Sequence, residues 1–150
     1  MVLLIITSII FIGYLVGIRL LYGWLPSISD SFYHLPKRWN WIFTVFLFTI
    51  SMLIIFSNPT PLMLCAGLCI ILVGAFPLFM DRKYKVFHFL FAILGIVLGM
   101  ISLWVDLHLW YMVIAFVLAC IAVKIYKWNN ETYWIEVFAF MSIIIGLMLK

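Results

Sequence analysis

The stretch "VLLIITSIIFIGYLVGIRLLYGWL" at residues 2–25, followed by "PSISDSFYHLPKR" at residues 26–38, sets the pattern of the whole chain. The first run contains one charged residue, Arg19. Such a run predicts a helix that crosses a bilayer, because a hydrocarbon core about 30 Å thick requires about 20 apolar residues. The second run holds prolines, serines, an aspartate and basic residues. It therefore predicts a loop at the membrane surface.

The composition excludes an ordinary water-soluble domain. Of the 150 residues, 69% are hydrophobic and only 9% are charged, whereas soluble domains have about 45–50% apolar and about 25% charged residues. The net charge is +4, but the basic residues flank the apolar runs and do not form a continuous face. We therefore expect no nucleic-acid partner.

Hydropathy predicts an all-α integral membrane bundle with six transmembrane helices in a single domain, residues 1–150. A window of about 19 residues finds apolar segments at residues 2–25, 40–57, 61–79, 86–105, 107–126 and 132–149. Each segment should be helical, because backbone groups in hydrocarbon must be hydrogen-bonded within the protein.

The distribution of basic residues predicts the orientation. Seven of them fall at the end of the bundle that carries the 26–38 loop: Lys37, Arg38, Arg82, Lys83, Lys85, Lys124 and Lys127. Only Lys150 falls at the other end. Since basic loops stay in the cytoplasm, we expect loop 26–38 inside, both termini outside and, as the host, a bacterial cytoplasmic membrane.

Several polar residues should converge on the same leaflet. Inserting an ionisable side chain at the centre of a membrane helix costs about 2.5–3.5 kcal/mol on insertion scales, so its presence indicates a structural or functional role. We predict a binding pocket at the cytoplasmic leaflet, with Asp30 and the serines as its lip. Its residues are Arg19, Ser29, Asp30, Ser31, His34, His88 and Glu136.

Structural explanations for these residues remain open. His88 could hydrogen-bond a backbone carbonyl, Arg19 and Glu136 could form a buried ion pair, and the loop serines or Asp30 could cap a helix. Asp106 and His108, at the opposite end, are expected in a solvated turn.

Small residues four apart occur in two helices, at Gly13 and Gly17 and at Gly95 and Gly99. Such pairs allow close helix approach. We expect packing within the chain, with dimerisation as the alternative.

The residues give little support for catalysis. A zinc hydrolase needs three or four ligands with an open position, and neither an H-x-x-x-H nor an H-E-x-x-H pair is present. Ser31, His88 and Glu136 are the types used in nucleophilic catalysis, but their spacing does not select them. Cys65 and Cys69 are expected to serve packing. We assign no catalytic residue, metal or cofactor.

The motifs "SISDSFYHLPKRWNWIFTVFLF" and "VFHFLFAILGIVLG" resemble the FRAG–DRAM–Sfk group of small polytopic membrane proteins. Short uncharacterised membrane proteins of bacteria and their phages are similar to this chain throughout. The matching positions are Ile28, Ser29, Asp30, Pro36 and His88, with "GAFP" at residues 74–77 preceding the histidine. The resemblance covers about the first 105 residues. It implies about six helices and an association with lipids. In eukaryotic members the first loop is expected to face the lumen, opposite to the orientation that the charges predict here.

The expected function is a lipid-headgroup-interacting binding or regulatory module, with membrane lipids as partners. One alternative is a lipid-modifying hydrolase or transferase that uses His88. Another is a small carrier, or a subunit of a homo-oligomer or larger membrane complex.

Overall fold

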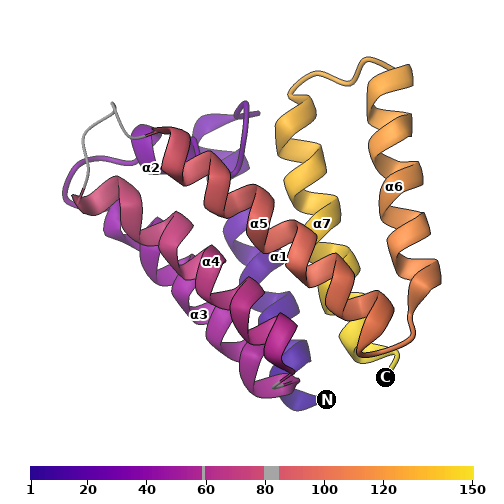
Figure 1. Cartoon of the computed structure of the whole chain (residues 1–150). Helices are drawn as coiled ribbons and strands as arrows, with labels where there is room; N and C mark the ends of the chain where they lie inside the picture. Colours follow the sequence, from indigo (N-terminus) through magenta and orange to yellow (C-terminus); the bar gives the residue numbers. More distant parts are fainter. Residues whose placement is uncertain (59, 80–84) are drawn as a thin grey trace.

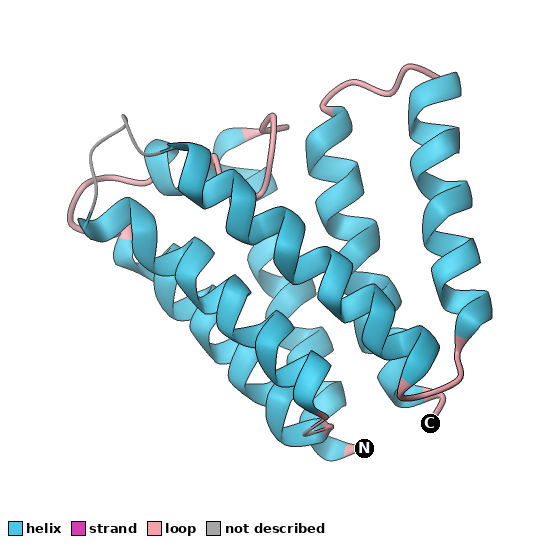
Figure 2. Cartoon of the chain, viewed as in Figure 1, coloured by secondary structure: helices cyan, strands magenta, loops and turns pink. Residues whose placement is uncertain are grey.

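The computed structural model describes residues 1–58, 60–79 and 85–150, and this part of the chain is all-helical, without strands (Figure 2). The long helices are α1 (Val2–Tyr22), α3 (Trp41–Ser57), α4 (Pro61–Phe79), α5 (Lys85–Val105), α6 (Trp110–Ile125) and α7 (Glu131–Met148). A single short turn of helix, α2 (Ser31–His34), lies in the first loop. The all-α prediction is confirmed.

Among the described residues, three helices are long and apolar enough to cross a membrane: Val2–Tyr22, Val86–Val105 and Glu131–Met148. The other three are apolar but shorter, at Trp41–Ser57, Pro61–Pro77 and Trp110–Ile125. Figure 1 shows the two termini at one end of the bundle, and the first loop and the α6–α7 connection at the other. We refer to these as the terminal end and the loop end. Arg82 and Lys83, counted above for orientation, lie outside the described residues.

Helix boundaries differ from the predicted ones where the backbone requires it. Helix α1 ends before Gly23, whose φ of 75° lies in the left-handed region that glycine adopts without steric cost. The segment predicted at residues 107–126 begins only at Trp110, because His108 has a φ of 56°.

Helix α4 packs between α3 and α5 (Figure 1). Glycines permit this close approach: a methyl group added at Gly95 would lie 2.7 Å from Ile70 Cδ1, and one added at Gly67 would lie 2.6 Å from Ile55 Cδ1. Gly99 meets Ile143 of α7 in the same way. The pair at Gly95 and Gly99 thus serves packing within the chain, as predicted.

The pair at Gly13 and Gly17 does not. A methyl group at either position would have no described atom within 4 Å outside its own helix backbone. Helix α1 instead joins the core through its opposite face, where Phe11 is fully buried and packs 5.2 Å from the ring of Phe140. Tyr14 stacks on Phe46 of α3, with ring centroids 3.7 Å apart.

Candidate functional site: a strapped loop and an open groove

The first loop is fixed to the start of α7. The Tyr133 amide donates to the Pro26 carbonyl at 3.0 Å, which satisfies one of the N–H groups that a helix start leaves without an intrahelical partner. The Ile28 amide donates to Glu136 Oε2 at 2.6 Å. The backbone and hydroxyl of Ser29 also lie within hydrogen-bonding reach of this carboxylate. Glu136 is therefore the acceptor that holds the loop on α7.

Within the loop, the polar groups bond to one another. Ser27 Oγ donates to Asp30 Oδ2 at 3.0 Å, and the Asp30 amide donates back to Ser27 Oγ at 3.1 Å. Ser31 is fully buried and its hydroxyl donates to the Ile28 carbonyl at 2.6 Å. Since that hydroxyl has one proton, Tyr14 must be the donor in the 2.6 Å contact between Tyr14 Oη and Ser31 Oγ.

These contacts bring together four predicted site residues: Ser29, Asp30, Ser31 and Glu136. His34 lies at the exposed edge, with Nδ1 3.0 Å from the Asp30 carbonyl oxygen. We call residues 26–31 with their contacts to α7 the strap. The cavity beneath it, which Ser29 and Glu136 line, has a volume of about 30 Å³. That volume suits one water molecule and is too small for a lipid headgroup.

The other two predicted residues occupy different surroundings. His88 lies in the first turn of α5, half-buried, with its ring edge-on to Phe89. The guanidinium of Arg19 lies over the Trp24 ring, 3.9 Å from its centroid. The ion pair expected between Arg19 and Glu136 does not form, and the one ion pair among the described residues joins Lys124 and Glu131. The Glu136 carboxylate accepts hydrogen bonds from loop amides and not from the Arg19 guanidinium.

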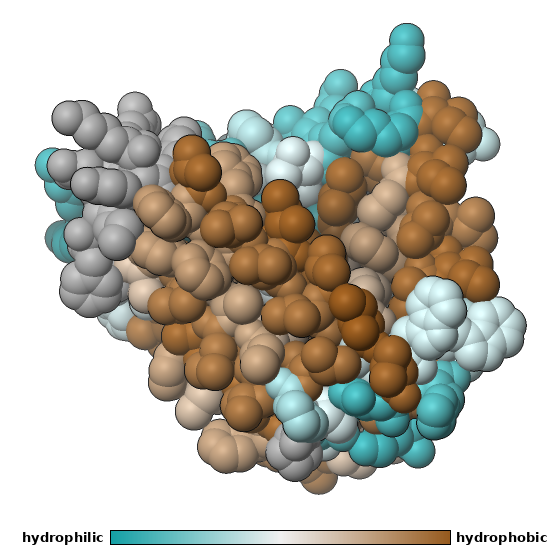
Figure 3. All heavy atoms as spheres, in the orientation of Figure 1, coloured by the Kyte–Doolittle hydropathy of each residue, from teal (hydrophilic) through white to brown (hydrophobic). Residues whose placement is uncertain are grey.

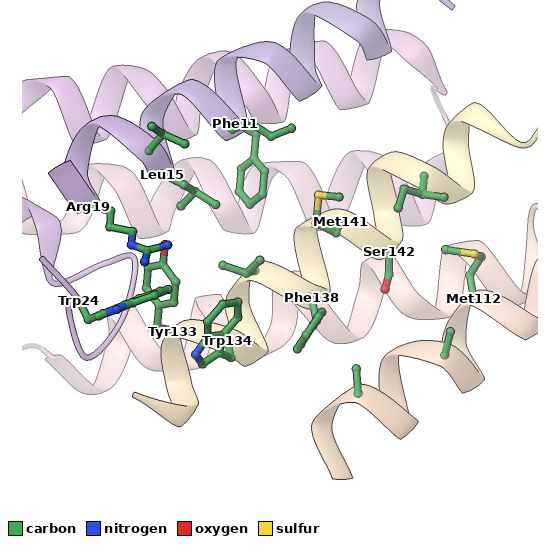
Figure 4. Close-up of a pocket in the computed structure, with 16 residues that line it drawn as sticks. Phe11, Leu15, Arg19, Trp24, Met112, Tyr133, Trp134, Phe138, Met141 and Ser142 are labelled. Atoms are coloured by element: carbon green, nitrogen blue, oxygen red, sulfur yellow. The ribbon is translucent and has the colours of Figure 1, made fainter. Parts of the chain in front are cut away.

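A larger space opens between α1 and α6, with α7 as its floor (Figure 4). This groove has a volume of about 550 Å³. Its lining is almost entirely apolar: Phe11, Ile12, Leu15, Val16, Met112, Ala115, Ala119, Val137, Phe138, Met141, Ser142 and Ile145, with Arg19, Trp24, Tyr133 and Trp134 at the loop end. The groove is thus a hydrophobic channel that ends at a cation among aromatic rings.

A second pocket continues from the mouth of the groove. It has a volume of about 330 Å³ and shares Trp24 and Trp134 with the groove. Trp128, Asn129 and Asn130 complete its lining. The ring centroids of Trp24 and Trp134 lie 5.3 Å apart, and those of Trp128 and Trp134 lie 5.0 Å apart at 74°. We call this pocket the tryptophan pocket.

Sequence reasoning identified Arg19 but missed both of these spaces. A groove depends on which helix faces remain uncovered, and hydropathy does not report this. One signal was present: Ala115 and Ala119 lie one turn apart and so share a face of α6, where their small side chains leave room.

The terminal end holds a separate polar network. Ser102 is fully buried, lies 3.0 Å from Thr60 Oγ1 and donates to Asp106 Oδ2 at 2.8 Å. Asp106 lies in a turn, as predicted, but it is half-buried and its carboxylate is bonded to Ser102. Ser102 in turn links α5 to Thr60, the residue before α4. His108 is exposed, as predicted.

No group of three or more His, Cys, Asp or Glu side chains that could hold a metal occurs among the residues that the structure describes. Cys65 and Cys69 are free thiols. Comparison of the chain with protein-family models, with curated proteins and with solved structures finds no match.

Proposed function

We propose that the chain is a six-span membrane protein that holds a phospholipid in the groove between α1, α6 and α7, and acts as a lipid-binding or regulatory module. The loop end would face the cytoplasm, and the lipid would belong to the leaflet on that side. The observation that carries the proposal is an apolar channel that ends at Arg19.

The surface supports membrane insertion of all six long helices. Large apolar side chains are exposed along the helices, among them Leu20, Phe56 and Ile93, each at least 60% exposed. Figure 3 shows apolar residues over the middle of one face, and hydrophilic residues toward its top and lower right. The shortest long helix, α6, has 16 residues and a length of about 24 Å. A span that short is accommodated by local bilayer thinning at modest cost.

The length of the groove suits one leaflet. Along α7 its lining runs from Tyr133 to Ile145, which is about 18 Å at 1.5 Å per residue. Half of a hydrocarbon core is about 15 Å thick. The two lengths are similar, so an acyl chain that enters from the loop end and spans about one leaflet would occupy most of the groove.

The charge at the mouth suits a phosphate. Arg19 lies in the last turn of α1, where its side chain can reach the headgroup level, and a guanidinium binds phosphate oxygens in a bidentate manner. Lys37, Arg38 and Lys127 are exposed at the same end. Basic sites between membrane helices bind anionic lipid groups in this way. The resemblance to a lipid-associated family is compatible with this proposal, which rests on the groove.

The test is to fill the groove. Ala119→Phe places a ring inside the channel, whereas Leu118→Phe adds a ring at a neighbouring α6 position that is 58% exposed and outside the lining. Each variant is purified in a non-ionic detergent, and native mass spectrometry counts the phospholipids retained. We expect Ala119→Phe to lose most of the bound lipid and Leu118→Phe to retain it. Equal retention by both variants would refute the proposal.

A further inference from the structure

The tryptophan pocket has the features of a cation site for a headgroup. Three tryptophans contribute to its lining, and the remaining lining residues are Asn129 and Asn130. Trp24 and Trp128 are 45% and 38% exposed, so water and ligands reach the rings. Indole faces attract cations, and clusters of aromatic rings recognise quaternary ammonium groups.

We propose that the tryptophan pocket binds the quaternary ammonium group of a choline phospholipid, whose phosphate lies at Arg19 and whose acyl chain lies in the groove. This inference rests on the proposed function and specifies the headgroup. The groove and the pocket share Trp24 and Trp134, so one amphiphilic molecule can occupy both spaces.

The chemistry of the lining selects the ammonium type. The five lining residues carry no charge, and the nearby carboxylate of Glu131 is paired with Lys124. A primary ammonium is a compact, strongly hydrated ion and would lose hydration here without a carboxylate partner. A trimethylammonium group presents methyl groups to the rings and donates no hydrogen bonds. The pocket therefore favours choline over ethanolamine headgroups.

The position of Arg19 fits the same arrangement. Its guanidinium lies over the Trp24 ring, 3.9 Å from the centroid, so Arg19 is held at the boundary between the groove and the tryptophan pocket. Arg19 lines the groove but not the tryptophan pocket. A phosphate at Arg19 would thus lie between the acyl chain in the groove and the ammonium group in the tryptophan pocket. A choline phospholipid has its groups in this order.

The experiment compares two lipids with identical acyl chains, phosphatidylcholine and phosphatidylethanolamine, titrated into the purified full-length protein in a non-ionic detergent. Binding is read by native mass spectrometry. We expect the choline lipid to bind about fivefold more tightly, a preference of the size that one cation–π contact provides. Trp128→Leu should reduce the preference to about one without weakening the ethanolamine lipid. Trp110→Leu, at an exposed tryptophan of the terminal end, is the matched control and should keep the preference.

Equal binding of the two lipids by the unaltered protein would overturn the inference, as would a Trp128→Leu variant that weakens both equally. Because Trp128 packs on Trp134 and Phe138, Trp128→Phe serves as a second variant if the leucine protein does not fold. It should give an intermediate preference, and an unchanged one would count against the pocket. If both lipids bind equally and Ala119→Phe abolishes binding, the proposal of lipid binding in the groove is retained and the headgroup assignment is refuted. If Ala119→Phe has no effect, both fail.

Discussion

The α3–α4–α5 side and the α1–α6 side of the molecule use small residues in opposite ways. On the first side, Gly67 and Gly95 are pressed against isoleucines of neighbouring helices, and the space is closed. On the second, Gly13 and Gly17 have no close neighbour in the described chain, and Ala115 and Ala119 line an open groove. A small residue thus permits close packing only where another helix is present to use the space; elsewhere the space beside it stays open.

The largest effect should come from filling the closed side. Gly95→Leu would force side-chain atoms into Ile70 and toward the Ala66 carbonyl, 3.3 Å from the added Cβ. Overpacking of this kind costs about 3 kcal/mol. Gly13→Leu, in the same motif on the open side, should change the free energy of unfolding little. Unfolding in mixed micelles with increasing dodecyl sulfate measures both, and equal losses would remove the contrast between the two sides.

The strap should be the next most sensitive feature. Glu136→Leu removes the acceptor of the Ile28 amide and leaves buried donors without a partner, which should cost about 2 kcal/mol. Hydrogen exchange of the amides of residues 27–31 should accelerate. Glu131→Gln is the control, because its ion pair with Lys124 is exposed and such pairs contribute at most about 1 kcal/mol. Unchanged exchange in the Glu136 variant would mean that the loop is held by other contacts.

A smaller effect is expected at the terminal end. Asp106→Ala leaves Ser102 with Thr60 as its remaining side-chain partner, and losing one such hydrogen bond costs about 1 kcal/mol. The same unfolding measurement tests it. A cost near zero would mean that the hydrogen bond between Ser102 and Asp106 contributes nothing to stability.

The smallest effect on stability should come from Arg19→Gln on the open side. The cation–π contact with Trp24 is at the surface, so the free energy of unfolding should change by less than about 1 kcal/mol. Retention of phospholipid should nevertheless fall, because the phosphate loses its guanidinium partner. A variant that unfolds easily but keeps its lipid would show that Arg19 has a structural role.

The positions of the six long helices could be predicted from the sequence because apolar runs and polar breaks decide them locally. Their ends shifted by a few residues where Gly23 and His108 take left-handed backbone angles. The meeting of Glu136 with the first loop also followed from topology, since both lie at the loop end. The hydrogen-bond partners of the Glu136 carboxylate could not be predicted. Loop backbone amides and Arg19 are alternative partners, and hydropathy does not indicate which of them binds the carboxylate. The groove depended on which helix faces remain unpaired, which only the packing reveals.

The occupancy of the groove is the claim on which the proposed function depends, and photo-cross-linking tests it most directly. The protein is reconstituted with a phospholipid that carries a diazirine on its acyl chain, irradiated and mapped by mass spectrometry. We predict that adducts concentrate on groove residues such as Ala115, Phe138 and Met141. Adducts spread evenly over exposed apolar positions outside the groove, such as Ile93 of α5, would contradict the account.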